Sequence, residues 1–163
     1  MNKDHISVKL NELVAYCDER LNAAEFTDYC PNGLQVESGE SVNKIVSAVT
    51  ASLAAIEAAA EADADLLLVH HGYFWKGEAQ TLTGIKGRRV RALIESGISL
   101  LAYHLPLDAH PELGNNARLG SVLGLQGESI APKSLVWGAQ LAEPQTASAL
   151  AAGVAEALQR EPL

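Results

Sequence analysis

Residues 44–71, KIVSAVTASLAAIEAAAEADADLLLVHH, decide the fold of this chain. Two short apolar runs, at residues 44–50 and 65–71, enclose an Ala-rich segment at 52–62 whose apolar side chains recur at helical spacing. A strand, a helix and a second strand in this order are typical of a βαβ unit, in which the strands are parallel and the crossover is right-handed. This stretch therefore predicts an α/β fold.

The same pattern is repeated directly downstream. A long loop at residues 72–87 leads to a helix at 88–97, which ends at Gly97, and then to a third strand at 98–106. Each helix returns the chain to the start of the next strand. We therefore expect a mixed sheet with parallel βαβ units flanked by helices.

The segment before this core predicts a helix and a turn. Apolar residues from Ile6 to Leu21 recur at three- and four-residue intervals, which indicates a helix at residues 8–22 with Ser7 as its N-cap. The Pro-Asn-Gly sequence at 31–33 then predicts a turn into an extended stretch.

The segment after the core predicts shorter elements. In order, we expect a turn rich in Pro, Gly and Asn at residues 105–116, a helix at 117–125, one or two strands within 128–142, and a last helix at 145–160 that follows Pro144. An α/β unit would place its next strand after that helix.

Length and charge limit what the protein does. A chain of 163 residues can bury a substantial core without disulfides or a structural metal, so a metal ion here would serve chemistry. The net charge of -8 argues against a protein that wraps nucleic acid, because neutralising the phosphates needs a surplus of Lys and Arg. Small anionic substrates stay compatible with it.

The cysteines and the apolar runs bear on location. Cys17 and Cys30 form no C-x-x-C pair, which is typical of a reduced compartment. The first ten residues carry charges where a signal peptide would be apolar, and no apolar run approaches the length of a membrane span. We therefore expect a cytoplasmic protein without a membrane partner.

Histidines and an aspartate gather where the predicted strands end. His70 and His71 end one strand, and Tyr103, His104 and Asp108 end or follow the next. Ligands of parallel α/β sheets bind at the carboxyl ends of the strands. Successive residues of a strand point to opposite sides, so the two adjacent histidines suit two ions, one imidazole each, with Asp108 as an oxygen ligand. Two ions about 3.5–4 Å apart are a typical arrangement for activating water.

Other interpretations of these residues stay open. His70 could be a core histidine bonded to a backbone carbonyl, and His71 a surface residue. His104 could be a ligand, a proton carrier, or a residue that orients a ligand. The trio at 73–75, Tyr-Phe-Trp, could stack on a flat heterocycle or simply pack the loop.

The basic run and the missing motifs narrow the chemistry further. Lys86, Arg88, Arg89 and Arg91 could bind phosphate at a helix start or form a solvated face. The sequence has no P-loop, dinucleotide-binding or G-x-S-x-G motif. Metal chemistry is therefore the strongest indication.

Three motifs resemble one family. DYCPNGLQVE at 28–37, VHHGYFWKGE at 69–78 and HLPLDAHPELGNN at 104–116 together resemble the dinuclear metal-centre proteins known as GTP cyclohydrolase 1 type 2, which are NGG-interacting-factor-like. The similarity runs from the first helix to about residue 145. Three separated motifs in the correct order make a chance match very improbable.

The resemblance implies a site, a fold and an assembly. It implies that His70 and His71 each bind one of two metal ions, that Asp108 is a further ligand, and that His104 lines the same pocket. It also implies two interlocked α/β domains and a ring-shaped homohexamer. We interpret residues 1–130 as an α/β metal-binding domain and 131–163 as the start of a second α/β element that is cut short.

One departure from the family concerns the ligand set. Family members complete the site near their C-terminus with a His and, four residues later, a Glu that bridges the ions, whereas this sequence has no histidine after His110. We expect an incomplete site unless His110, Glu112, His104 or another subunit fills the gap.

The resemblance implies a metal-dependent hydrolase. In a cyclohydrolase, water would attack the imidazole carbon of a guanine nucleotide with loss of formate, and His104 is the candidate proton carrier. The two divalent ions could be Zn, Fe, Mn, Ni or Co. The alternatives are a protein that stores, delivers or senses metal without turnover, and a scaffold in which His70 and His71 have no functional role.

Overall fold

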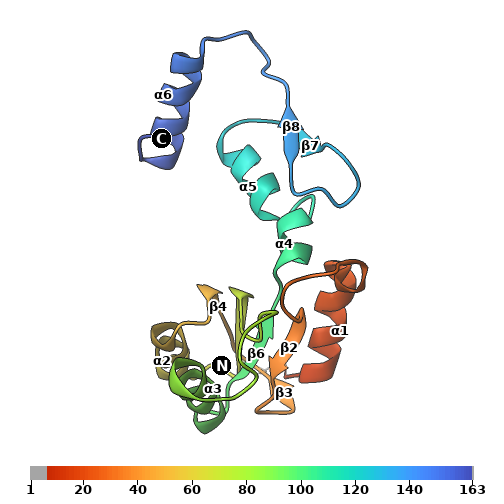
Figure 1. Cartoon of the computed structure of the whole chain (residues 1–163), viewed down its shortest axis with the longest axis vertical. Coiled ribbons are helices and arrows are strands. Elements are labelled where there is room, and N and C mark those ends of the chain that lie inside the picture. Colours follow the sequence, from red (N-terminus) through yellow and green to blue (C-terminus); the bar gives the residue numbers. More distant parts are fainter. Residues whose placement is uncertain (1–6, 163) are drawn as a thin grey trace, which may run out of the picture. The chain divides into compact units, whose positions relative to one another are not determined.

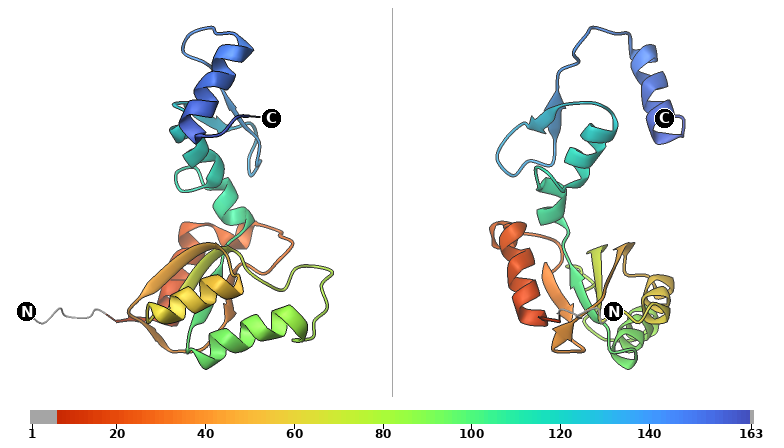
Figure 2. Two further views of the ribbon diagram at one scale, coloured as in Figure 1. Left: turned by 90° about the vertical axis from the view of Figure 1, so that its left-hand side faces the viewer. Right: turned by 180° about the vertical axis from the view of Figure 1, so that it is seen from behind.

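The computed structural model describes residues 7–162, so Ile6 lies outside the described residues. Figure 1 labels its elements, and Figure 2 shows two further views. The chain divides into two compact units, Met1–Pro106 and Leu107–Leu163. The predicted domain division at residue 130 stays a prediction, because the compactness of a unit does not by itself define a domain.

The first unit contains a central sheet and its helices. Its elements are β1 (Val8–Lys9), α1 (Leu10–Arg20), the 3-10 helix η1 (Ala23–Glu25), β2 (Gly33–Val36), β3 (Ser41–Val42), β4 (Ile45–Thr50), α2 (Leu53–Glu61), β5 (Leu66–His71), α3 (Gly84–Glu95) and β6 (Ser99–Ala102). The helix α4 (Leu105–Ala109) crosses into the second unit.

The four-stranded sheet has the order β2-β6-β5-β4. Strands β4, β5 and β6 are parallel, as both predicted βαβ units require, and β2 joins them antiparallel with a register shift after Leu34. The predicted mixed α/β sheet is confirmed. Because β2 runs backwards, its first residue, Gly33, pairs with the last residue of β6, Ala102.

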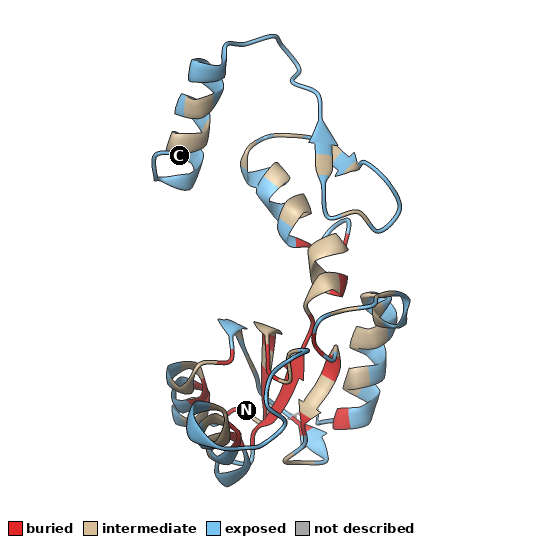
Figure 3. Ribbon diagram, in the orientation of Figure 1, coloured by how far each residue is buried: buried red, intermediate tan, exposed pale blue. Residues whose placement is uncertain are grey.

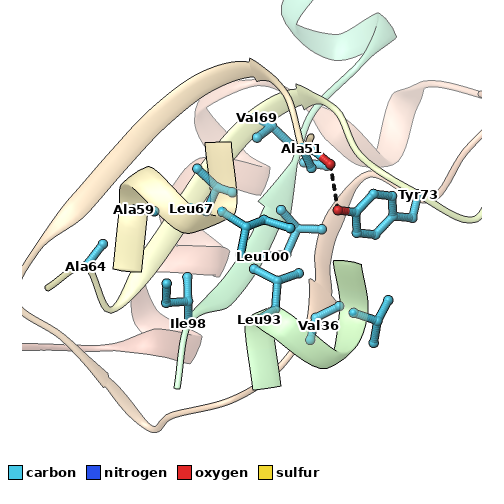
Figure 4. Close-up of a cluster of buried hydrophobic side chains, with 13 residues drawn as sticks. Val36, Ala51, Ala59, Ala64, Leu67, Val69, Tyr73, Leu93, Ile98 and Leu100 are labelled. Carbon is cyan, nitrogen blue, oxygen red and sulfur yellow. Dashed lines mark hydrogen bonds between the residues drawn. The ribbon is translucent and has the colours of Figure 1, made fainter. Parts of the chain in front are cut away.

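Both faces of the sheet are covered. Alternate strand residues, such as Leu67 of β5 and Leu100 of β6, pack against Ile56 of α2 and Leu93 of α3 (Figure 4). On the opposite face, α1 lies against the sheet in both views (Figures 1 and 2) and supplies the buried Leu10. The strands at the centre of the unit are therefore buried almost throughout (Figure 3).

The helix of the first βαβ unit has a clear local cause. Ser52 is the N-cap of α2, and its hydroxyl accepts a hydrogen bond from the amide of Ala55 at 3.1 Å. The helix buries Ile56 and Ala59 completely. Burying an Ile side chain of this kind stabilises the fold by about 1.5–3 kcal/mol.

Two predicted helix starts and one strand end are wrong. The first helix begins at Leu10 after Lys9, without a side-chain cap from Ser7, because Val8 pairs with Val42 in a two-stranded sheet. The helix predicted from residue 88 begins at Gly84.

The third predicted strand ends at Ala102, and a helix begins within the predicted turn at 105–116. The cause is a loop distant in sequence. Asn32 and Asp28 accept the amides of His104 and Leu105 at 2.7 and 2.9 Å, which ends the strand and caps α4.

The second unit contains α5 (Asn115–Val122), β7 (Gly127–Ser129), β8 (Trp137–Ala139) and α6 (Ala147–Leu158). Strands β7 and β8 form an antiparallel pair, and the hydroxyl of Thr146 caps α6. The predicted helices and short strands are confirmed, with bounds that differ by a few residues. No helix within residues 7–162 is long and apolar enough to cross a membrane.

Candidate metal centre

Three histidines meet at the carboxyl edge of the parallel strands. His70 and His71 are the last residues of β5, and His104 follows β6 by two residues. Each offers a ring nitrogen, and these atoms lie within 4.8 Å of one another. The prediction that the two strand ends bring the histidines together is confirmed.

The adjacent histidines converge more than their strand positions suggest. The ring centroids of His70 and His71 lie 4.4 Å apart, and His104 lies 5.1 and 5.7 Å from them. Since His71 is the final residue of its strand, the strict alternation of the pleat no longer holds its ring away. This donor set suits one shared ion as well as one ion for each imidazole.

Each imidazole is held through Nδ1. Nδ1 of His70 lies 3.0 Å from the carbonyl oxygen of Tyr103, which can only accept, so this nitrogen carries the proton and Nε2 the lone pair. Nδ1 of His71 lies 3.1 Å from the hydroxyl of Thr50, which can donate or accept. Metal-binding histidines are commonly oriented by such a second hydrogen bond.

The loop before β2 supplies a group that the sequence analysis did not identify. Oδ1 of Asp28 lies 2.8 Å from Nδ1 of His104, and the carboxylate side chain is only 2% exposed. The antiparallel β2 begins where β6 ends, so the loop before it reaches the same edge. The motif DYCPNGLQVE places Asp28 and Asn32 next to a turn, but it is the pairing of β2 with β6 that brings them to the site.

The pKa of Asp28 reflects two opposing effects. Burial raises the pKa of this carboxyl, but hydrogen bonds from His104, Asn32, Leu105 and Tyr29 outweigh burial and hold the pKa below its usual value. The group is therefore ionised at neutral pH. The carboxylate can therefore accept the Nδ1 proton of His104 and orient the ring.

A second group of potential ligands overlaps the first but suits a metal less well. Asp28, Cys30 and His104 also have donor atoms within 4.8 Å of one another. Burial, with the charge of Asp28, raises the pKa of the Cys30 thiol to about 11, so the thiolate that a metal needs is scarce. Both oxygens of Asp28 already accept hydrogen bonds.

Gln35 connects the two loops that form the site. Its amide oxygen accepts the amide of Tyr73 at 2.7 Å, and its amide nitrogen donates to the carbonyl of Pro31 at 2.8 Å. Gly72 packs closely against Gln35, because a Cβ at this position would collide with the Gln35 side chain. Only glycine fits here, so the segment after His71 is held close to the loop before β2.

The aromatic trio divides between core and site. Tyr73 is buried, and its hydroxyl donates to the carbonyl of Ala51 at 2.6 Å (Figure 4). The ring of Trp75 instead lies 5.0 Å from His104 and 6.1 Å from His71. The packing interpretation thus holds for Tyr73, whereas Trp75 borders the histidines.

The remaining predicted residues, Asp108 and His110, belong to the second unit. Asp108 is on α4 in the second unit, and its Oδ1 accepts from Nδ2 of Asn115 at 2.5 Å. Buried His110 accepts the amides of Glu112 and Leu113 through Nδ1, both at 3.1 Å, and so stabilises its own loop. The ligand roles of these residues stay predictions.

The basic run lies on α3. Lys86 forms an ion pair with Glu78 at 3.7 Å and lies 5.8 Å from the ring centre of Phe74. Arg88 and Arg91 are exposed. Arg88 and Arg91 thus agree with a solvated helix face, whereas the half-buried Lys86 contacts the loop after the histidines.

Known sequences resemble this chain over nearly its whole length. A family model described as Duf34/NIF3 (NGG1p interacting factor 3) matches residues 8–163. A Pseudomonas aeruginosa protein named GTP cyclohydrolase 1 type 2 homolog is 52% identical over 162 residues, which are 97% of this chain and 64% of that protein. The chain thus spans just under two thirds of the length of such relatives.

Solved structures resemble the fold. One, described as protein ybgI of unknown function, has a TM-score of 0.89 and 47% identity, over 96% of this chain and 63% of the other. A Thermus thermophilus protein has a TM-score of 0.83 and 38% identity, over 96% and 64%. The fold is therefore shared with these proteins.

Proposed function

This chain belongs to the Duf34/NIF3 family, and on that premise we propose that it binds divalent metal ions at the histidine cluster and acts as a metal-dependent hydrolase. One observation carries the proposal. His70, His71 and His104 offer ring nitrogens within 4.8 Å of one another at the sheet edge where ligands bind.

The donor set fits a divalent transition metal. Imidazole nitrogen suits Zn, Fe, Ni and Co, and a carboxylate such as that of Asp108 would extend the choice to Mn. The Nδ1 contacts of His70 and His104 favour the tautomer in which Nε2 carries the lone pair. Two ions would be bound in the arrangement that the family resemblance implies.

Each residue has a proposed role in catalysis. His70 and His71 hold the metal, Asp108 is a further ligand, and His104 accepts and returns a proton at Nε2. Bound metal would supply Lewis acidity that activates water. The name of the curated relatives suggests the imidazole carbon of a guanine nucleotide as the reacting position, with loss of formate. Trp75 would lie next to such a planar ring.

Metal content is the first test. Protein purified without a histidine tag should contain about two ions per chain by elemental analysis if the site is dinuclear. His70→Ala/His71→Ala should lose them. The control Glu57→Ala/Glu61→Ala, which removes two exposed carboxylates of α2, should keep them. A folded histidine variant that retains its metal would overturn the proposal.

Turnover separates the enzyme from the alternative class. Specific hydrolysis of a guanine nucleotide that is abolished by His71→Ala supports the hydrolase. Metal binding without turnover of nucleotides supports storage, delivery or sensing of ions. An intact metal-free protein with neither property supports the scaffold.

Assembly and location are part of the same proposal. The resemblance implies a homohexamer in the cytoplasm, with a nucleotide or another small molecule as substrate and without nucleic acid or membrane partners. Sedimentation of the purified chain measures its mass in solution. A monomer at micromolar concentration would contradict the proposed assembly.

A further inference from the structure

The Asp28 carboxylate is surrounded by hydrogen-bond donors. The amide of Tyr29 and Nδ1 of His104 lie 2.6 and 2.8 Å from Oδ1. Nδ2 of Asn32 and the amide of Leu105 lie 2.9 Å from Oδ2. A carboxylate is the side chain that accepts on both of its ends, whereas an Asn would turn an NH2 group toward two of these donors.

This arrangement determines the state of the imidazole. A group that only accepts requires the proton on Nδ1 of His104, which leaves the lone pair on Nε2. Asn32 fixes the backbone of the same residue, because its Oδ1 accepts the His104 amide at 2.7 Å. The ring therefore has little freedom either to rotate or to exchange tautomers.

We propose that Asp28 is a positioning residue that locks His104 in the tautomer with a proton on Nδ1, so that Nε2 serves the histidine cluster. The contribution of this tautomer to the reaction rests on the proposed function, since the lone pair of Nε2 is needed whether His104 binds metal or carries a proton. The tautomer itself depends on neither metal nor substrate.

The direct test is NMR of the histidine ring nitrogens in the full chain, without added metal. Spectra recorded at about pH 8, where histidines are mainly neutral, should show His104 protonated at Nδ1 and unprotonated at Nε2. The signals are assigned by their loss in His104→Gln. A proton on Nε2 in the unmodified chain overturns the inference, whatever the variants do.

Two variants separate positioning from a general structural role. In Asp28→Asn the two tautomers of His104 should mix or reverse, while circular dichroism stays that of a folded chain. The matched control is Asp18→Asn, which alters the carboxylate that accepts from the Tyr103 hydroxyl at 2.6 Å. Asp18→Asn removes one negative charge, as Asp28→Asn does, but next to Tyr103 instead of His104. It should leave the His104 tautomer unchanged. An unchanged tautomer in folded Asp28→Asn contradicts the inference.

Metal affinity supplies the second readout. The ring nitrogens of His104 and of the proposed ligands His70 and His71 lie within 4.8 Å of one another, and loss of a residue that orients a side chain of a metal site usually weakens metal binding by about 10–100-fold. We expect this for Asp28→Asn titrated with Zn²⁺ alone, and no change for Asp18→Asn. If the tautomer is as expected but no chain binds metal, the proposed function fails and the inference stands. If metal binds and Asp28→Asn changes neither tautomer nor affinity, the inference fails.

Discussion

The two units of the chain use apolar residues in different ways. In the first, Leu66, Leu67, Leu100 and Leu101 are fully inaccessible to solvent, between helices on both faces of the sheet. In the second, His110 and Gly114 are the buried residues among those described, and apolar side chains such as Val122 and Val136 are exposed. Apolar periodicity therefore predicts an element, but a core requires layers that cover each other.

The same difference applies to the candidate ligands. The three histidines are held by the first unit through hydrogen bonds to residues far away in sequence. Asp108, in the second unit, accepts a hydrogen bond from Asn115, seven residues further along the chain. We therefore expect the histidines to determine metal binding and Asp108 to modulate it.

The largest expected effect is on metal content. A triple variant, His70→Ala, His71→Ala and Asp108→Ala, should lose all bound metal by elemental analysis, because the predicted ligands of both units are removed. Asp108→Ala alone should lose less than His70→Ala/His71→Ala. A folded triple variant that keeps its metal shows that the ligands lie elsewhere.

The next prediction compares a buried leucine of the first unit with an exposed leucine of the second unit. Leu67→Ala removes a fully buried side chain and should lower the free energy of unfolding by about 2–5 kcal/mol. Leu119→Ala, on the 46% exposed position of α5, should change it by less than about 0.5 kcal/mol. Urea denaturation measures both. Equal losses would mean that the second unit has a core of its own.

A smaller effect compares two helix caps. Ser52 and Thr146 accept from the amides of Ala55 and Ala149 at 3.1 and 3.2 Å. Ser52→Ala should destabilise the first unit by about 1 kcal/mol. Thr146→Ala should reduce the helicity of α6, seen by circular dichroism, and leave the main unfolding transition in place. A shift of that transition by Thr146→Ala would show that the two units unfold together.

The smallest effect depends on pH. Burial raises the pKa of Asp65, but the amides of Asn43 and Lys44, at 2.7 and 2.9 Å, outweigh it and lower the pKa below its usual value. A lowered pKa stabilises the fold above the unfolded-state pKa, about 3.9, and this contribution is lost as the pH falls through the folded-state pKa. Asp65→Asn should therefore cost no more than about 1 kcal/mol at pH 7, and the difference from the unmodified chain should shrink below about pH 4. A difference in stability that does not change with pH would mean that it comes from the altered shape of the side chain and not from the charge of Asp65.

Much of the fold and part of the site follow from the sequence. The βαβ units were predictable because their strands and helices differ in local pattern, and the histidine cluster followed because parallel strands end at one edge. Asp28, Thr50 and Gln35 were not predictable in these roles, because their contacts depend on strand pairing. The start of α4 was missed for the same reason, since its cap comes from Asp28.

The antiparallel β2 also has a consequence for how the protein folds. The bond between Asp28 and His104 joins residues 76 positions apart, and the bond between His70 and Tyr103 spans 33. Contacts between residues so distant in sequence form only after the chain has closed large loops. The oriented histidine cluster is therefore a late product of folding, and tight metal capture would report that the whole sheet, from β4 to β2, has been assembled.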